Sequence, residues 1–482
     1  MTVTPAPATP RRTFAALALS VAGFTTLQNL VVPALPLIQE DLGTDTSGVT
    51  WTVTAWLIAA AVATPLLGRV GDMVGRRRVF LFSIAGVVVG SILAALAPTL
   101  GVLIVARVIQ GAGGAMFPLA FGLLREAFPR DRVPSAIGGM SAVIAVGGGV
   151  GAVLAGPIST AFGWRAVFVV PLLLSIPGAA LVRFLVPESA DRAPGRLNVV
   201  AALLLSGWLV ALLLPLSSGS TWGWGSPLVV GLFALAAALI VAWAIVEWRS
   251  REPLVDMRTM LSPAIWPMNA AAVLIGAVMF AVFAYYPRFV QEPAASGYGL
   301  GLTVAQSGLL MLPMLATMGI AGFLVGPIGR VLGFRAQISW SMGLIVVSTL
   351  GLAFIHSTVW LVAIEAAVFG FGLGIVYSAI TSVVVQSVPA TETGVASGMN
   401  ANLRTIGSSV GVAIMTAIVT GSAVGAAGIP TEQGYETGFL TVAIIGSGAI
   451  VVTVVGSILA YRRGRRPADD TSGIETPVPV AA

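Results

Sequence analysis

Three ionisable residues lie deep inside long apolar stretches of this sequence, namely Arg107, Glu365 and Arg404. A charge at bilayer depth costs at least about 2.5–3.5 kcal/mol, so such residues indicate functional sites. Loss of water favours the neutral form of an acid, whereas a nearby arginine favours its carboxylate, and an acid balanced between the two can take up and release a proton. We predict that Glu365 is such a proton-coupling acid; the alternative is a static ion pair with Arg404 or Arg107.

Both arginines share a helical face with an amide side chain and with two glycines. Gln110 lies on the face of Arg107, and Asn400 lies on the face of Arg404. Such a face brings a charge and an amide beside a close contact between two helix backbones. We predict that these four residues, together with Glu365, belong to a cavity for protons and substrate. For Arg107, a structural arginine that bonds loop carbonyls is the alternative.

A second kind of site is the run GRVGDMVGRRR at residues 68–78. Its carboxylate, Asp72, falls at the C-terminal end of a predicted helix, where the helix dipole repels negative charge by roughly 0.3–1 kcal/mol. Asp72 therefore needs a positive partner, which could be an adjacent arginine such as Arg76 or the N-terminus of another helix. Gly68 and Gly75 would let a neighbouring backbone approach closely enough.

The composition identifies the solvent around these residues as lipid. Only 9% of the 482 residues are charged, 57% are apolar and the mean hydropathy is +0.97, which no soluble domain of this length could shield from water. The chain has no cysteine and one histidine, so we expect no disulfide, no metal centre and no cofactor. The 25 basic residues are all arginines, and apart from those embedded in the spans they lie in the short connections, so the net charge of +6 does not predict nucleic-acid binding.

Apolar stretches long enough to cross a bilayer must position the polar residues. About fourteen stretches of roughly 18–25 residues can be counted, which predicts an all-α polytopic membrane protein. The alternating strands of a membrane barrel are not found in the sequence. The predicted spans are 14–37, 50–67, 79–97, 102–124, 136–161, 165–186, 198–216, 228–247, 268–290, 304–325, 336–355, 359–382, 394–419 and 438–461.

The arginines also predict how the chain lies in the membrane. They precede the first span at Arg11 and Arg12, follow the second span at residues 76–78, and recur in every second connection, whereas the opposite side carries only Arg165 and Arg288. Such an excess of positive charge is typical of the cytoplasmic side. We therefore predict a multi-pass protein of the cytoplasmic membrane with an even number of spans and both termini cytoplasmic.

A degraded copy of the 68–78 run recurs at residues 326–335, at a constant offset of 258 residues. It keeps all three glycines and has Arg330 in place of the acid. The repeat predicts two six-helix bundles related by a pseudo-two-fold axis, with a cavity near the midplane that is reached alternately from each side. The predicted parts of the chain are a cytoplasmic N-terminal segment at 1–13, an N-terminal bundle at 14–186, a linker with two extra helices at 187–266, a C-terminal bundle at 267–461 and a disordered cytoplasmic tail at 462–482.

The run at 68–78 resembles the loop signature of the major facilitator superfamily, G-x-x-G-D-x-x-G-R-R, and lies between the second and third predicted spans. Residues 107–114, RVIQGAGG, are similar to the R-x-x-Q-G-x-G pattern of the family's fourth span. Six spans, two inserted spans and six more resemble the fourteen-span drug and proton antiporter branch of that family.

This resemblance implies roles for two of the residues above. Arg107 would belong to a proton pathway, where it tunes a nearby acid or receives substrate. Asp72 would latch a cytoplasmic gate against the corresponding helix of the other half, whose N-terminus near Thr393 and Gly394 could accept the negative charge. The remaining predicted gate residues are Gly68, Gly75 and Arg76.

The fifth predicted span carries small residues at every fourth position, and we predict that Gly147, Gly151 and Gly156 pack against a neighbouring helix. The pattern is similar to the antiporter-associated signature G-x-x-x-G-P-x-x-G-G. It departs from that signature with Ala152 at the proline position and Ala155 at the first of the paired glycines. A close-packed helix is still expected, but the support for antiport from this signature is weaker.

The first span lacks the acid that relatives exporting cationic drugs usually carry before the A-L-P seen here at residues 34–36. The equivalent position is Leu27, followed by Gln28 and Asn29. Delocalised cations prefer carboxylates or aromatic faces, so two embedded arginines and one embedded acid suit them poorly. We therefore predict a cavity, with Gln28 and Asn29 in its wall, for a neutral or weakly acidic amphipathic substrate.

Together these patterns predict a monomeric secondary transporter that exports small amphipathic molecules and is driven by inward proton movement. Its partners would be a small-molecule substrate, protons and the lipid bilayer. The alternative is a proton-independent facilitator or importer. An enzyme is not expected, because one buried acid and one histidine supply too few catalytic groups. Tryptophans near the span ends, Trp222 and Trp224 among them, are interpreted as interfacial anchors rather than ligand contacts.

Overall fold

The structure is a computed structural model that describes residues 10–189, 192–194, 196–423 and 429–464. Within these residues, fourteen helical segments are long and apolar enough to cross a membrane, which confirms the predicted all-α polytopic fold. A helix is the form expected of each span, because lipid offers no hydrogen-bond partner to an open backbone. Residues 1–9 of the predicted N-terminal segment and residues 465–482 of the predicted tail lie outside the described residues.

The first bundle, here called the N-half, contains six spans. The fourth passes through a short 3-10 segment, and the sixth consists of two helices in succession. The elements are α1 (Pro10–Asp41), α2 (Thr46–Val74), α3 (Arg76–Ala95), α4 (Leu100–Gln110), η1 (Gly111–Ala115), α5 (Met116–Ala127), α6 (Val133–Phe162), α7 (Ala166–Val169) and α8 (Leu172–Leu185).

An inserted pair of spans, α9 (Val199–Trp222) and α10 (Pro227–Arg249), and the short α11 (Met257–Met260) precede the second bundle. This second bundle, the C-half, again contains six spans. Its elements are α12 (Trp266–Gln291), η2 (Ala294–Ser296), α13 (Val304–Leu310), α14 (Leu312–Leu332), α15 (Phe334–Phe354), α16 (Val359–Ser387), η3 (Ala390–Glu392), α17 (Thr393–Gly421) and α18 (Glu432–Gly464).

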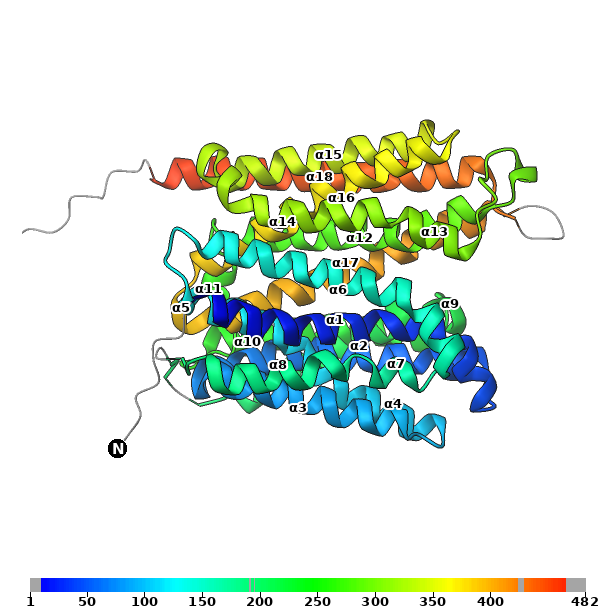
Figure 1. Ribbon diagram of the computed structural model, residues 1–482. Coiled ribbons are helices and arrows are strands. Elements are labelled where there is room, and N and C mark those ends of the chain that lie inside the picture. Colours follow the sequence, from blue (N-terminus) through cyan, green and yellow to red (C-terminus); the bar gives the residue numbers. More distant parts are fainter. Residues whose placement is uncertain (1–9, 190–191, 195, 424–428, 465–482) are drawn as a thin grey trace, which may run out of the picture.

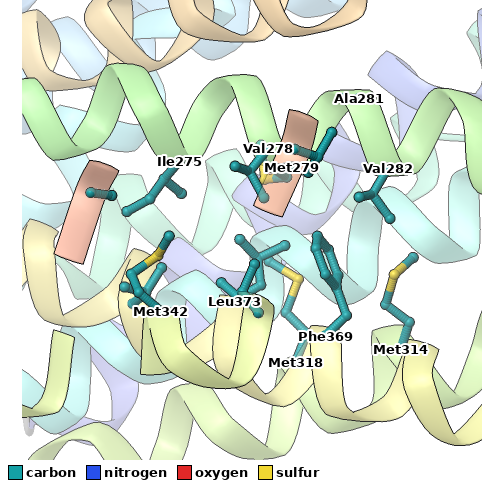
Figure 2. Close-up of a cluster of buried hydrophobic side chains, with 14 of the residues drawn as sticks. Ile275, Val278, Met279, Ala281, Val282, Met314, Met318, Met342, Phe369 and Leu373 are labelled. Atoms are coloured by element: carbon teal, nitrogen blue, oxygen red, sulfur yellow. The ribbon is translucent and has the colours of Figure 1, made fainter. Parts of the chain in front are cut away.

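The two halves lie side by side with their helices along a common direction, the N-half below and the C-half above in Figure 1. Each half has its own apolar core. Figure 2 shows the core of the C-half, where Val278 and Met279 of α12 face Met318 of α14 and Phe369 of α16. The start of α1 and the end of α18 lie at the same end of the molecule. We call this the signature end, because α2 also finishes there, and the opposite end the far end.

The glycine repeat has a structural counterpart in each half. Gly75 separates α2 from α3 with φ of +124°, and Gly333 separates α14 from α15 with φ of +76°. Residues with a side chain rarely adopt such values, so the last glycine of the repeat sets the helix boundary in both halves. The helix α2 runs to Val74, beyond the predicted end of its span, and Asp72 therefore lies in its final turn.

The halves meet along two seams in which small residues let backbones touch. In the first seam, a Cβ atom at Gly68 would lie 2.8 Å from the carbonyl oxygen of Gly394, so α2 and α17 pack backbone to backbone. In the second seam, the equivalent glycine of the repeat, Gly326 of α14, packs directly against Ser135 of α6. The repeated sequence thus supplies equivalent contacts on both sides of the pseudo-two-fold axis.

The inserted pair covers the first seam. The helix α9 packs against both α2 and α17, and α10 packs against α9. The Trp208 and Trp243 rings join the two inserted helices, with centroids 5.9 Å apart. Near the signature end, the buried carboxylate of Glu247 accepts hydrogen bonds from the Trp243 indole at 3.1 Å and from the backbone of Leu254 at 2.8 Å.

Candidate functional site

A cavity of about 760 Å3 lies between the two halves. Along α17 its wall begins at Ala401 and ends at Thr420, so the cavity occupies the part of the molecule toward the far end. Of the predicted cavity residues in the N-half, Gln28, Asn29 and Arg107 line it, whereas Gln110 does not, which corrects its predicted place in the wall. Most of the remaining wall is apolar, and Arg107 is its only ionisable member among the described residues.

Arg107 is held at the cavity wall by neutral groups. Its side chain is 1% exposed. The Nε atom donates to the carbonyl oxygen of Thr52 at 3.0 Å, and Nη1 donates to Oε1 of Gln110 at 2.6 Å. Gln110 in turn donates to Ser91 at 2.9 Å. No carboxylate forms an ion pair with Arg107 in the described part of the chain, so its charge remains available to an acceptor or acid on a ligand.

An aromatic ring lies beside this guanidinium group. The Arg107 Cζ atom lies 5.2 Å from the centroid of the Trp56 ring, a distance at which cation–π attraction operates. The Phe24 ring contacts both Trp56 and Phe117, with centroids 6.3 Å and 5.5 Å away. The cavity therefore combines one fixed positive charge with flat apolar surfaces.

The predicted cavity residues of α17, Asn400 and Arg404, lie on a face of this helix that does not line the cavity. Asn400 donates to Oδ1 of Asn269 on α12 at 3.0 Å. Arg404 stacks over the Tyr377 ring of α16, 3.9 Å from its centroid, and donates to the Tyr377 hydroxyl group at 3.0 Å. Neither Asn400 nor Arg404 lines the cavity. This corrects the interpretation of this helical face as part of the cavity wall.

The face of α17 that lines the cavity carries hydroxyl and amide groups that were not predicted from the sequence. Asn402 lines the cavity and donates from Nδ2 to the carbonyl oxygen of Ala61 on α2 at 2.7 Å, so it joins the two halves. Thr405, Ser408 and Ser409 lie along the same wall. The signal that was available is their spacing: Asn402, Thr405 and Ser409 share a side of α17 that is turned away from Asn400 and Arg404, whereas Ser408 follows Arg404 by one turn.

Glu365 lies away from the cavity, between α15 and α16, which corrects its predicted place in the cavity wall. A Cβ atom at Gly351 of α15 would clash with the Glu365 carboxyl group, which shows how closely the two helices approach there. Ser348 donates to the Glu365 carbonyl oxygen at 2.7 Å. The Oε2 atom is buried and has no hydrogen-bond partner among the described residues. Arg404 and Arg107 are both bonded elsewhere, so the alternative of a static ion pair with either of them is wrong.

The signature end is closed by contacts centred on Asp72. This residue is 0% exposed, and its two carboxylate oxygens accept hydrogen bonds from the backbone N–H groups of Gly394 and Val395, both at 3.1 Å. Arg76 forms an ion pair with the same carboxylate at 2.6 Å and also contacts Glu126. The N-terminus of α17 is therefore a partner of Asp72, as expected from the sequence.

Two further contacts join the halves at this end. Arg125 of α5 donates to the Thr393 hydroxyl group at 2.7 Å and to the Val388 carbonyl oxygen at 2.9 Å. Arg330, which replaces Asp72 in the second copy of the repeat, donates to the carbonyl oxygen of Asp131 in the N-half at 3.1 Å. Both copies of the repeat thus carry a charged residue that reaches the opposite half.

The predicted packing glycines of α6 behave differently from one another. A Cβ atom at Gly151 would lie 2.5 Å from the carbonyl oxygen of Thr26 on α1, and Thr26 donates to the Gly147 carbonyl oxygen at 3.2 Å. At Gly156 an added Cβ would meet nothing within 4 Å, so its predicted packing role is corrected. The four-residue spacing continues instead through the buried Ala155.

Two six-span bundles, joined by pseudo-symmetric seams around a cavity that is closed at one end, define the architecture of a membrane transporter. A family model described as Major Facilitator Superfamily matches residues 17–412. The chain belongs to the Major Facilitator Superfamily.

Relatives in this family are named as drug and antibiotic exporters. The chain is 30% identical to the tetracenomycin C resistance and export protein of Streptomyces glaucescens over 84% of this chain and 75% of that protein. It is 29% identical to the methylenomycin A resistance protein of Streptomyces coelicolor over 78% and 79% of the two chains. It is also 28% identical to the multidrug transporter protein MdtP of Bacillus subtilis, over 81% and 72%.

A solved structure has the same fold. The human organic anion transporter MFSD10 (TETRAN) matches 92% of this chain and 99% of its own with a TM-score of 0.66. At 15% sequence identity, this likeness is evidence for the fold alone.

Proposed function

We propose that this chain exports small, neutral or weakly acidic amphipathic molecules by alternating access. The observation that carries the proposal is the cavity of about 760 Å3 in which Arg107 is the only ionisable lining residue among those described. Relatives named for tetracenomycin C export and methylenomycin A resistance support export of a small organic molecule.

The chemistry of the cavity wall supports this class of ligand. Apolar and aromatic walls accept the apolar body of an amphipathic molecule, while Gln28, Asn29 and Asn402 offer amide groups that fix its orientation. Arg107 would bind an oxygen acceptor or an acidic group. A permanent cation would face this buried positive charge without a carboxylate to compensate it, so the cavity selects against cations.

The orientation of the chain in the membrane is inferred from its charge distribution. The signature end carries the arginine-rich run at residues 76–78, and positive charge favours the cytoplasmic side. With both termini cytoplasmic, the described conformation is closed to the cytoplasm by Asp72 and has its cavity toward the outside. It would therefore be the state from which an exporter releases its substrate.

The proposal also includes coupling of export to inward proton movement. Glu365 lies outside the cavity, but an unpartnered carboxyl oxygen inside a helix bundle is costly as a charge, so a proton there stabilises the packing of α15 against α16. We propose that Glu365 loads a proton in this conformation and releases it when α16 moves. The alternative is a facilitator or importer without proton coupling.

Flux measurements in proteoliposomes test the proposal. Purified protein is reconstituted, a pH gradient is imposed, and movement of tetracenomycin C and methylenomycin A is followed, with protein-free liposomes as the blank. The proposal predicts accumulation against the concentration gradient that collapses with a protonophore. Equilibration that is indifferent to the pH gradient would support the facilitator instead, and absence of any protein-dependent flux would contradict transport of this ligand class.

A further inference from the structure

One wall of the cavity is built by the inserted pair of helices. Leu216 and Ser217 from the last turns of α9, and Trp224 from the turn that follows it, line the same cavity as Arg107. A pair of spans that served only as a spacer between the halves would face lipid or a single half. Here α9 contacts both halves and reaches the cavity at the far end.

The Trp224 ring is held in place by the backbone around it. Gly223 has φ of +82°, which lets the chain reverse directly after α9. A Cβ atom at Gly219 would lie 2.7 Å from two carbons of the Trp224 ring, so the indole rests on the bare backbone of α9. The Trp222 ring lies 6.4 Å from the Trp51 ring of α2, which ties the turn to the N-half.

The second inserted helix has a different role. In the most apolar window of α10 only 17% of residues are buried within the protein, against 44% for α9, so α10 faces lipid and shields α9 from it. Trp248 of α10 is 57% exposed and does not line the cavity. The cavity-lining position of Trp224 therefore differs from that of an ordinary interfacial tryptophan.

We propose that Trp224, positioned by α9, is a specificity residue that stacks on aromatic rings of the transported ligand. This role is proposed in addition to the interfacial anchoring predicted from the sequence. Because Trp224 and Arg107 line the same cavity, a ligand can place a flat ring system at Trp224 while an acidic or acceptor group reaches the guanidinium group. This inference rests on the proposed function, because it assumes that the cavity binds the transported molecule.

A matched pair of ligands isolates the stacking contribution. The probes are 2-naphthoate and its saturated analogue decahydro-2-naphthoate, which share a carboxylate and a carbon skeleton. Binding is measured by calorimetry on protein in lipid nanodiscs, with empty nanodiscs as the blank. Stacking between aromatic rings adds about 0.5–1.5 kcal/mol beyond buried area, so the wild-type protein should prefer 2-naphthoate by about three- to tenfold.

Four variants then test the role of Trp224. Trp224→Leu keeps an apolar side chain and should abolish the preference for 2-naphthoate over its saturated analogue. Trp224→Phe should retain most of this preference. Gly219→Ala keeps Trp224 but displaces its ring from the backbone of α9. This variant should also reduce the preference for 2-naphthoate. Trp248→Leu, on the lipid-facing helix of the same pair, should leave it unchanged.

The outcomes separate this inference from the proposed function. If the wild-type protein binds both probes and Trp224→Leu keeps the wild-type preference, the role of Trp224 is refuted while the cavity and its ligand class stand. If the wild-type protein binds neither probe, the proposed ligand class itself is refuted. Arg107→Gln serves as the reference, because loss of the guanidinium group should weaken the binding of both probes equally.

Discussion

The carboxylate of Asp72 accepts a hydrogen bond from the backbone N–H of Gly394 at 3.1 Å, although the two residues lie 322 positions apart and in different halves. At the end of α2 the helix dipole opposes a negative charge, and at the start of α17 the dipole favours one. The unfavourable position of Asp72 in its own helix is thus compensated only when the halves meet at the signature end. This makes Asp72 a natural latch for one of two conformations.

Replacing Asp72 by asparagine should open the signature end. A hydrogen bond to a charged group contributes about 1.5–3 kcal/mol, so loss of the charge should shift the equilibrium by about tenfold or more. The chain has no cysteine, so a single Ser397→Cys probe on buried α17 reports access without background. We expect its maleimide labelling rate in detergent to rise about tenfold in the Asp72→Asn background.

Asp131→Asn is the control for this experiment, because Asp131 also contacts the other half but through an exposed side chain. Exposed ion pairs contribute about 0–1 kcal/mol, so the labelling rate should change by a few-fold at most. Equal labelling rates in the wild-type and Asp72→Asn proteins would show that Asp72 does not hold the gate.

Arg107→Lys should bind acidic ligands more weakly than the wild type even though it keeps the charge. The planar guanidinium group bonds Thr52 and Gln110 at once, which an ammonium group cannot reproduce in the same geometry. Arg107→Gln, which removes the charge, should weaken the affinity for 2-naphthoate by about 10- to 100-fold, the equivalent of about 1.5–3 kcal/mol. Unchanged affinity in Arg107→Gln would remove Arg107 from the binding site.

Gln28→Glu should change the charge preference of the cavity. The substitution keeps the shape of the side chain and adds a carboxylate to a wall that has none among the described residues. We expect binding of a quaternary ammonium dye to tighten about tenfold at neutral pH, measured by fluorescence polarisation. Gln306→Glu, at an exposed helix start outside the cavity, should leave dye binding unaltered. Tight dye binding by the wild-type protein would contradict the proposed exclusion of cations.

Glu365→Gln should separate transport from the pH gradient. The neutral amide mimics the protonated acid permanently, so downhill exchange should persist while gradient-driven accumulation falls about tenfold or more. Glu247→Gln is the matched control, because Glu247 is also buried but accepts hydrogen bonds from Trp243, Leu254 and Val255. That variant should lower thermal stability and leave coupling intact. Full accumulation by Glu365→Gln would assign proton coupling to another group.

Gly151→Val and Gly156→Val should differ in stability. The added side chain at Gly151 collides with the Thr26 backbone of α1, whereas Gly156 faces open space. Overpacking of this kind costs about 1–3 kcal/mol, so the melting temperature of Gly151→Val should fall by several degrees while that of Gly156→Val stays near the wild type. Equal melting temperatures would mean that α1 and α6 are less tightly packed than described.

Several site residues could be predicted from the sequence because each had few physical options. Asp72 at a helix C-terminus needed an arginine or another helix N-terminus, and it has both. Polar side chains in apolar spans avoid lipid, which is why Gln28, Asn29 and Arg107 could be expected at the cavity. The same reasoning gave the fourteen spans and their two repeats.

Other positions depend on packing that periodicity does not reveal. The glycines that pointed to the Arg404 face of α17, Gly407 and Gly411, pack against α12. They mark a contact within the C-half rather than the cavity, and Asn402 on the opposite face was missed for that reason. The helix α16 is apolar on all sides, so the sequence could not indicate which neighbour Glu365 would meet.

The central claim is that two halves open and close around the Arg107 cavity from opposite ends. Four exposed residues allow spin labels on a cysteine-free chain: Phe184 and Val331 near the signature end, and Leu96 and Trp360 near the far end. Distance distributions by pulsed electron resonance should change reciprocally on addition of 2-naphthoate across a range of pH, one pair lengthening as the other shortens. Distances that stay fixed, or that lengthen at both ends together, would contradict alternating access.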